Sequence, residues 1–188
     1  WDDGSPDGNV TEAAEYQEGN GEILIAIDDG YAGEWVPATG YYSAESHPRV
    51  ILFCQQRPNG ILCVFDESYA VKVPSAQHIN DALSNHPTPA RAGLGKEMAE
   101  IRGVLHNYGS GIYTLAGPNS VDESVKVLRS WISKDVNGIR KLLVHPRCKI
   151  FRKEPPKFSH IDGTQWQDEY GHGLAAIRYL VWALRHNQ

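Results

Sequence analysis

The feature that most constrains the fold is a pair of apolar runs joined by a tight turn. The runs cover 49–55 and 61–65, and the residues that separate them include Asn59-Gly60. Asn and Gly tolerate the positive φ values of a tight turn, so Asn-Gly between two apolar runs is a strong short-range signal for a β-hairpin. The chain therefore predicts an antiparallel strand pair in its first half.

Further strands and helices are predicted on both sides of this hairpin. An earlier apolar run, 22–27, is followed by Asp28, Asp29 and Gly30, as is typical of a buried strand ended by a turn. Helices are expected from Ser75, over 98–108, after Ser120 and over 170–185, and strands over 90–94, 111–116 and 142–145. Ser120 and Glu123 have the spacing of a capping box, in which the Ser hydroxyl accepts a hydrogen bond from the third helical amide.

This order of elements predicts an α/β fold with one mixed sheet. The hairpin supplies an antiparallel part, crossover helices supply a parallel part, and helices cover both faces. We expect the strand at 22–28 to be central and the last helix to bring His172 toward Asp28. Residues 1–20 are rich in Gly, Asp, Glu and Asn, which favours a linker or loose N-terminal segment before a domain over 21–188.

The amino-acid composition argues against several classes of protein, namely disordered, membrane-spanning and disulfide-rich proteins. Hydrophobic residues make up 41% and charged residues 22%, a balance that argues against disorder over the whole chain. No stretch reaches the ~18 consecutive apolar residues that a membrane helix needs, so we expect no membrane association. The three cysteines, Cys54, Cys63 and Cys148, indicate no disulfide framework and favour a reducing compartment.

Charge is distributed unevenly along the chain. Residues 1–48 hold eleven acids and no Lys or Arg, so all 18 basic residues follow them. Seven of these crowd one segment: Arg140, Lys141, Arg147, Lys149, Arg152, Lys153 and Lys157. Such a cluster can neutralise nucleic-acid phosphates, but a solvated charged face explains the same pattern.

Asp28 and Asp29 are the first candidates for a metal site. They follow the first strand, and ligands of α/β proteins bind at the carboxyl ends of strands. Carboxylates are the ligands that Mg²⁺ and Mn²⁺ prefer, and two adjacent acids supply negative charge. A plain Asp-Gly turn is the alternative.

Other candidates are weaker. Asp66 and Glu67 end the predicted third strand, and we expect them to cap it in solvent rather than join Asp28. Glu97 and Glu100 flank a helix start, where acids also favour the helix dipole. Asp168 precedes His172 by four residues, and the two lie on the same helix face if the last helix begins at or before residue 168.

Several common motifs are absent or incomplete. Gly93 to Lys96 lacks the Ser or Thr and the earlier Gly of a phosphate-binding loop. His145 and Cys148 are close, but no Cys-x-x-Cys accompanies them to form a zinc site. No Gly-x-Ser-x-Gly elbow indicates a serine hydrolase.

The tail, 171–179, resembles the C-terminal signature of the nuclease domain in the large terminase subunit of tailed bacteriophages. That family typically ends in Asp-His-x-x-Asp-Ala-x-Arg-Tyr, and the matching residues here are His172, Ala176, Arg178 and Tyr179. Four further segments, 1–3, 25–31, 118–129 and 143–148, also resemble segments of that family and occur in the same order along the chain.

The resemblance implies a ribonuclease H-like fold and two-metal phosphodiester cleavage, in which carboxylates hold two Mg²⁺ or Mn²⁺ ions. It implies double-stranded viral DNA as substrate and host cytoplasm as location. The implied partners are the terminase motor domain of a full-length chain, the portal and the small terminase subunit.

This sequence departs from the family pattern at its acids. The acid of the last helix falls at Ala175, the preceding one at Gly171, and the middle one near Gly95, so Asp28 alone is plainly in place. Glu97, Asp168, Glu169 or Glu67 could substitute, and Ala175 could be natural or engineered.

Two hypotheses follow. The first is a metal-dependent endonuclease with Asp28, Glu97, Asp168 and His172 as catalytic residues, and with Asp28, Asp29, Glu97 and Asp168 as metal ligands. In this hypothesis the basic residues Arg140 to Lys157 contact DNA phosphates. The second is a catalytically dead module of the same fold that binds DNA or a packaging partner.

Overall fold

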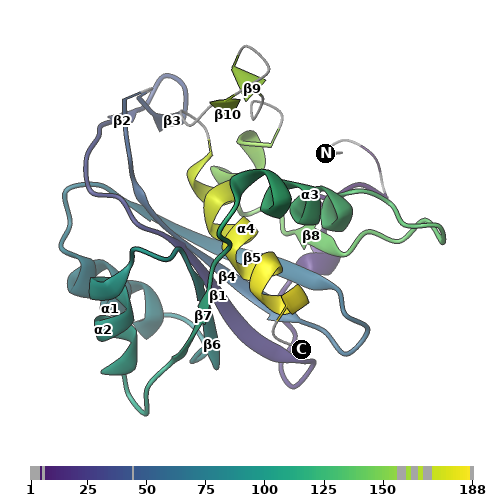
Figure 1. The fold of residues 1–188 in the computed structure, drawn as a ribbon, viewed down its shortest axis with the longest axis horizontal. Helices are drawn as coiled ribbons and strands as arrows, with labels where there is room; N and C mark the ends of the chain where they lie inside the picture. Colours follow the sequence, from purple (N-terminus) through teal and green to yellow (C-terminus); the bar gives the residue numbers. More distant parts are fainter. Residues whose placement is uncertain are drawn as a thin grey trace.

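The computed structural model describes residues 5, 7–43, 45–155, 160–161, 165–166 and 171–186. Its centre is a six-stranded sheet in the order β7-β6-β1-β4-β5-β8 (Figure 1). These strands are β1 (Glu22–Asp28), β4 (Arg49–Gln56), β5 (Leu62–Ala70), β6 (Arg91–Leu94), β7 (Tyr113–Ala116) and β8 (Leu142–Val144). β4 is antiparallel to β1 and β5, and the other pairs are parallel. The predicted hairpin and the mixed sheet with 22–28 inside it are therefore confirmed.

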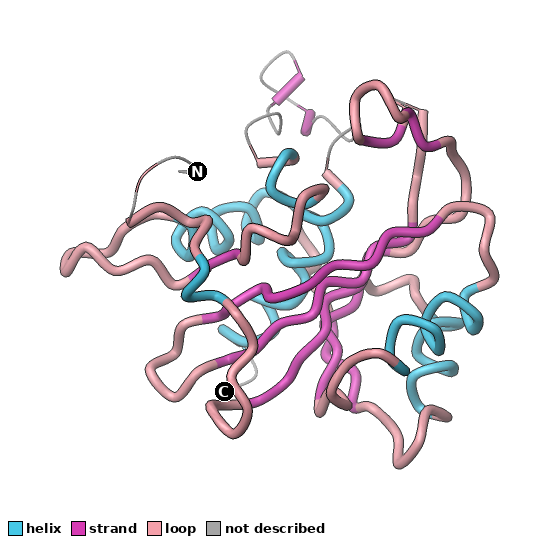
Figure 2. The backbone as a smooth tube through the Cα atoms, turned by 180° about the vertical axis from the view of Figure 1, so that it is seen from behind, coloured by secondary structure: helices cyan, strands magenta, loops and turns pink. Residues whose placement is uncertain are grey.

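Helices cover both faces of the sheet, as the sequence predicts (Figure 2). α1 (Ser75–Ser84) and α2 (Ala99–His106) pack on one face, where alternate residues of β1 such as Ile25 and Ile27 point. α3 (Val121–Ile132) and α4 (His172–His186) pack on the other, against Leu24 and Ala26. This alternation follows from the two-residue period of a strand buried on both sides. No helix in the described ranges is long and apolar enough to cross a membrane.

α4 lies unusually close to the sheet at β6. A Cβ added to Gly93 would lie 2.6 Å from Cα of Leu180, so the absence of a side chain permits the approach. This contact fixes the position of the helix that carries His172 and Tyr179.

Several element boundaries differ from the prediction. β5 continues to Ala70, so Asp66 and Glu67 lie inside a strand rather than at its end. α2 ends at His106, two residues before the predicted end. The Ser120 cap is confirmed, because its Oγ accepts from the Glu123 amide at 3.3 Å. The expected start of the last helix at Tyr170 falls outside the described residues, and α4 is described from His172.

The described ranges also include four very short strands and two 3₁₀ turns. They are β2 (Trp35–Val36) paired with β3 (Tyr41–Tyr42), β9 (His160–Ile161) paired with β10 (Gln165–Trp166), η1 (Glu12–Ala14) and η2 (Phe151–Lys153). None of these was predicted.

Part of the N-terminal segment is held against the domain. Asn9 is buried and donates to the carbonyls of Ile132 and Leu142 at 3.0 and 3.1 Å. Val10 forms an isolated parallel bridge with Val144. These contacts contradict a loose segment for this stretch, while the domain boundary at residue 20 stays a prediction.

The topology brings the candidate residues to one edge of the sheet. β1 and β6 are parallel and pair Ile27 with Leu94, so Asp28 and Gly95 follow side by side at their carboxyl ends. The first turn of α4 meets the same edge, because His172 contacts Asp28. This is the edge at which ligands of α/β proteins bind.

Candidate active site at the carboxyl edge of the sheet

Asp28 is held by two side chains of α4. Its Oδ2 lies 3.2 Å from Nδ1 of His172, and its Oδ1 accepts from the Tyr179 hydroxyl at 3.3 Å. Only 13% of the Asp28 side chain is exposed, compared with 6% for His172. The expected approach of His172 to Asp28 is confirmed, and Tyr179 joins the pair because it lies two helical turns further along the same face.

His172 is surrounded by hydrogen-bond acceptors. Its Nε2 lies 3.0 Å from the carbonyl oxygen of Ser46, and its Nδ1 faces the Asp28 carboxylate. Two acceptors require two N–H donors, which only the protonated imidazolium provides. Burial opposes that charge, but the hydrogen bond with Asp28 and the charges of Asp28 and Glu154 outweigh it and raise the pKa of His172 above its ordinary value.

An open pocket of about 340 Å³ adjoins this pair. Its lining residues come from the ends of β1 and β6, the β6–α2 loop and α4: Asp28, Asp29, Gly95, Lys96, Glu97, Met98 and Tyr179. Arg102 of α2 fixes the loop, because it donates to the Gly95 carbonyl at 2.8 Å. The structure thus brings Glu97 into the same pocket as Asp28, with an exposed side chain.

Asp29 lines the pocket but is committed to a different partner. Its Oδ1 accepts from Nε of Arg49 at 2.7 Å. Arg49 is only 3% exposed, and it also donates to the Val73 carbonyl and the Ser75 hydroxyl. This ion pair ties Asp29 to the start of α1.

The described residues do not fit a two-metal centre. Within them, no group of three or more His, Cys, Asp or Glu side chains could hold a metal ion. Asp168, a predicted ligand, lies outside the described residues. Ala175 lies on α4 between the two residues that contact Asp28, where a carboxylate would face the site, and it offers only a methyl group.

Two carboxylates, one partly and one fully buried, lie behind the site. Glu67 accepts from the Ile150 and Phe151 amides, each at 2.8 Å, so the expectation that it caps a strand in solvent is wrong. Glu154 is completely buried beneath the first turn of α4. Burial outweighs the hydrogen bonds that these groups accept and raises the pKa of each to about 7. No local sequence pattern indicates Glu154, and the sequence analysis missed it.

The other weaker acids have ordinary partners. Asp66 Oδ2 lies 3.1 Å from Nε2 of His86, on the face of the sheet that α1 covers. Glu100 lies in the first turn of α2, as expected, where its charge favours the helix dipole.

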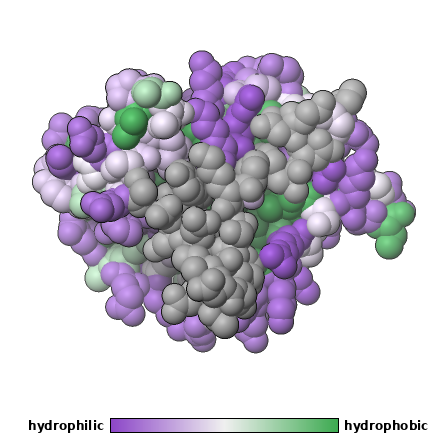
Figure 3. Space-filling model, turned by 90° about the horizontal axis from the view of Figure 1, so that it is seen from above, coloured by the Kyte–Doolittle hydropathy of each residue, from purple (hydrophilic) through white to green (hydrophobic). Residues whose placement is uncertain are grey.

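The predicted basic cluster is divided by β8. Lys141 precedes Leu142, which pairs with Leu62 at the end of the sheet opposite Asp28, about 20 Å away at ~3.3 Å per residue. Arg140 lies beside Lys141 in the loop that joins α3 to β8. This loop projects from the body and ends in a hydrophobic tip (Figure 3), where Val136 is fully exposed.

The remaining basic residues follow β8. Arg147 pairs with Glu15 at 2.7 Å, and Lys153 donates to the Gly40 carbonyl at 2.8 Å. Arg152 donates to the Pro146 carbonyl, and Lys149 is exposed. Six of the seven predicted basic residues thus lie on both sides of β8, and Lys157 lies outside the described residues. Binding of this segment to DNA stays a prediction.

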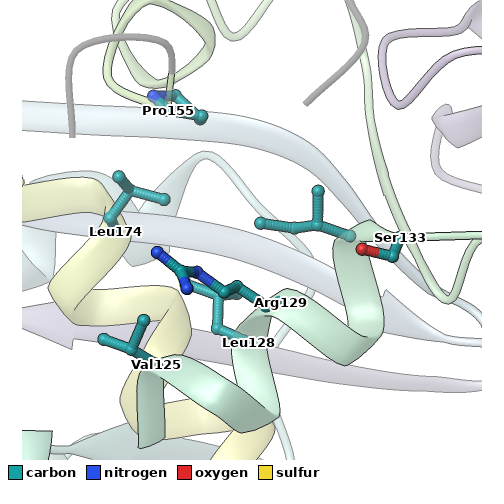
Figure 4. Close-up of a pocket in the computed structure, with 7 residues that line it drawn as sticks. Val125, Leu128, Arg129, Ser133, Pro155 and Leu174 are labelled. Carbon is teal, nitrogen blue, oxygen red and sulfur yellow. The ribbon is translucent and has the colours of Figure 1, made fainter. Parts of the chain in front are cut away.

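A second hollow, of about 170 Å³, lies between α3 and the start of α4 (Figure 4). It is lined by Val125, Leu128, Arg129, Ile132, Ser133, Pro155 and Leu174. None of these described lining residues is an acid, so they add no ligand to the candidate site.

Solved structures provide a close match to this architecture. The nuclease domain of the bacteriophage P22 large terminase aligns with a TM-score of 0.68 and 12% identity, over 97% of this chain and 93% of that chain. The large terminase nuclease domain of bacteriophage SPP1, solved with bound Mn, aligns with a TM-score of 0.61 and 14% identity, over 97% of this chain and 98% of that chain. No protein-family model and no curated protein sequence matches the chain. The chain therefore has the ribonuclease H-like fold of these domains.

Proposed function

We propose that this chain is a terminase-type nuclease module that contacts double-stranded viral DNA during genome packaging. The observation that carries the proposal is the position of Asp28 at the carboxyl edge, bonded to His172 and Tyr179 of the last helix. These are residues of the tail signature and of the strand that carries the leading acid in the resembling family. The likeness in fold to two large terminase nuclease domains supports the same assignment.

Cleavage by this sequence is proposed to be weak or absent. Two dications a few ångströms apart repel each other, and several carboxylates are needed to hold them. Here the family positions fall at Gly95, Gly171 and Ala175, Asp29 is paired with Arg49, and the His172 ring, whose pKa is raised, lies beside Asp28. The mutual attraction of Asp28 and His172 competes with a divalent cation, so Mg²⁺ or Mn²⁺ binds weakly.

An active endonuclease is the second candidate, and one observation favours it. Glu97 lines the same pocket as Asp28 and Asp29, so three carboxylates border one cavity. In this alternative Glu97, alone or with Asp168, completes the set of ligands, and the chain cuts DNA as it stands.

The proposal also covers the partners of the module, its location and its contacts with DNA. The motor domain of a full-length chain, the portal and the small terminase subunit are the proposed partners, in the host cytoplasm. Phosphate contacts are proposed for Arg147, Lys149, Arg152 and Lys153, on the segment that follows β8, and with less support for Arg140 and Lys141.

Calorimetric titration with Mn²⁺ and a plasmid-nicking assay test the proposal. We expect the chain to bind Mn²⁺ at best in the millimolar range and to nick plasmid slowly or not at all. Ala175→Asp should raise Mn²⁺-dependent nicking at least ~tenfold, equivalent to ~1.4 kcal/mol off the barrier. Ser130→Asp adds the same charge at an exposed position of α3 and serves as the matched control.

The opposite results in these two assays would favour the active endonuclease over a module with weak or absent cleavage. In that pattern the unmodified chain nicks readily, Asp28→Ala abolishes both nicking and tight Mn²⁺ binding, and Ala175→Asp adds little. If the chain neither binds DNA nor gains nicking activity in Ala175→Asp, the nuclease proposal itself fails.

A further inference from the structure

Glu154 accepts three hydrogen bonds from three separate parts of the chain. Its Oε1 accepts from the hydroxyl groups of Tyr41 in β3 and Tyr69 in β5, at 2.8 and 2.9 Å. Its Oε2 accepts from the backbone amide of Leu174, at 2.9 Å. The carboxylate is fully buried, so each of these bonds forms away from water and is strong for its type.

The bond to Leu174 caps α4. The first four amides of a helix have no partner within the helix, and a side-chain oxygen usually satisfies one of them from the position just before the helix. Here the oxygen comes from a residue 20 positions earlier in the chain. The capping group therefore fixes the start of α4 relative to the body of the domain, beyond stabilising the helix itself.

The Glu154 carboxylate and the Tyr69 hydroxyl pack tightly against the backbone of the first turn of α4. A Cβ at Gly173 would lie 2.5 Å from the Tyr69 hydroxyl and 2.9 Å from Oε2 of Glu154. The glycine therefore lets the carboxylate and the tyrosine reach the helix backbone. Leu174, whose amide is capped, and Pro155, which follows Glu154, line the hollow between α3 and α4 (Figure 4).

The same turn of α4 carries His172. Its ring lies between the Asp28 carboxylate and the Ser46 carbonyl, at 3.2 and 3.0 Å. The ring therefore cannot follow a shift of the helix start and keep both contacts. A shift of the helix start by about an ångström away from either acceptor would stretch that contact to about 4 Å, beyond hydrogen-bond range.

We propose that Glu154 is a positioning residue, whose carboxylate anchors the first turn of α4 and thereby holds His172 against Asp28. Through Tyr41 and Tyr69 it also links that turn to the β2–β3 hairpin and to β5. The proposal rests on the assignment of Asp28 and His172 to the active centre, and it adds a residue outside that centre on which the geometry depends.

NMR spectroscopy of the full chain at pH 8 tests this role in Glu154→Gln. The amide side chain keeps the shape but has only one acceptor oxygen and no charge. We expect hydrogen exchange of the Leu174 amide to accelerate about tenfold beyond any change in global unfolding, and the imidazole signals of His172 to move. The His172 signals are identified by their loss in His172→Asn.

Glu67→Gln is the matched control. It removes another largely buried carboxylate that accepts two backbone amides, but those amides belong to Ile150 and Phe151 rather than to α4. It should lower the unfolding midpoint and leave the His172 signals in place. Because these readouts need neither metal nor DNA, they hold even if the nuclease proposal fails.

Two results would overturn the positioning role. One is a destabilised Glu154→Gln whose His172 signals and Leu174 exchange match the unmodified chain. The other is an equal change in Glu67→Gln. Should Glu154→Gln not fold, Tyr41→Phe removes one donor to the carboxylate and should move the His172 signals in a smaller step, and unchanged signals there would also refute the proposal.

Discussion

Glu154 also determines how the stability of the protein should vary with pH. Its pKa rises from 4.5 to about 7 in the folded chain, because burial of the charge outweighs the bonds from Tyr41, Leu174 and Tyr69. A group with a raised folded-state pKa binds its proton more tightly in the folded state. Its stabilising contribution is therefore complete below pH 4.5 and is lost as the pH rises through about 7.

The size of this contribution follows from the shift. Each pKa unit corresponds to ~1.4 kcal/mol, so the shift corresponds to about 3 kcal/mol at most between pH 4.5 and pH 8. His172 acts in the same direction, since its pKa is also raised and the Glu154 charge contributes to the shift. Glu154→Gln removes the titrating carboxyl group and also removes part of the rise in the pKa of His172.

Urea unfolding followed by tryptophan fluorescence at pH 5, 6, 7 and 8 measures the effect. The free energy of unfolding of the unmodified chain should fall over this range, and that of Glu154→Gln should fall less. The cost of the substitution should then shrink by about 2–3 kcal/mol from pH 5 to pH 8. A cost that stays constant with pH would show that Glu154 titrates at an ordinary value, and the reasoning from its burial would be wrong.

Two further predictions concern packing and DNA. Gly93→Ala should cost about 1–3 kcal/mol in urea unfolding, because the new Cβ would lie 2.6 Å from the Leu180 backbone, whereas Gly103→Ala, with open space around it in α2, should gain about 0.5–1 kcal/mol. Equal effects of the two substitutions would contradict the close approach of α4. Reversal of Arg147, Lys149 and Arg152 to Glu should weaken DNA binding for all sequences alike and reduce its salt slope by about 2–3, and an unchanged slope would exclude this segment from the DNA path.

The order of the main elements was predictable because its signals are local. The Asn59-Gly60 turn, the apolar run of β1 and the Ser120 cap each act within a few residues, and each is confirmed. The end of β5 was not predictable in this way. Acids usually mark the end of a strand, but Glu67 remains in β5 because two distant amides satisfy its carboxylate.

The candidate site was predictable only in part. Asp28 and His172 are far apart in sequence, and the strand order together with the family-like tail placed them together. Glu154 caps α4 and also accepts from Tyr41, 113 residues away, and no pattern along the chain encodes such a contact. The basic residues that crowd together in the sequence lie on both sides of β8, so their closeness along the chain does not by itself place them on one surface.

Of the three positions that lack family acids, 95 and 175 are not equivalent in the structure, and this makes position 175 the informative one. A Cβ at Gly95 would lie 3.0 Å from Cε of Met98 and 3.3 Å from the Tyr179 ring, which itself bonds to Asp28. A longer acidic side chain there presses on the group that orients Asp28, so its loss of activity would be ambiguous. Ala175 is partly exposed and lies between His172 and Tyr179 on the helix. A carboxylate at 175 would lie one helical turn from both His172 and Tyr179 on the same face, so its effect on nicking tests the missing charge without crowding the Tyr179 ring.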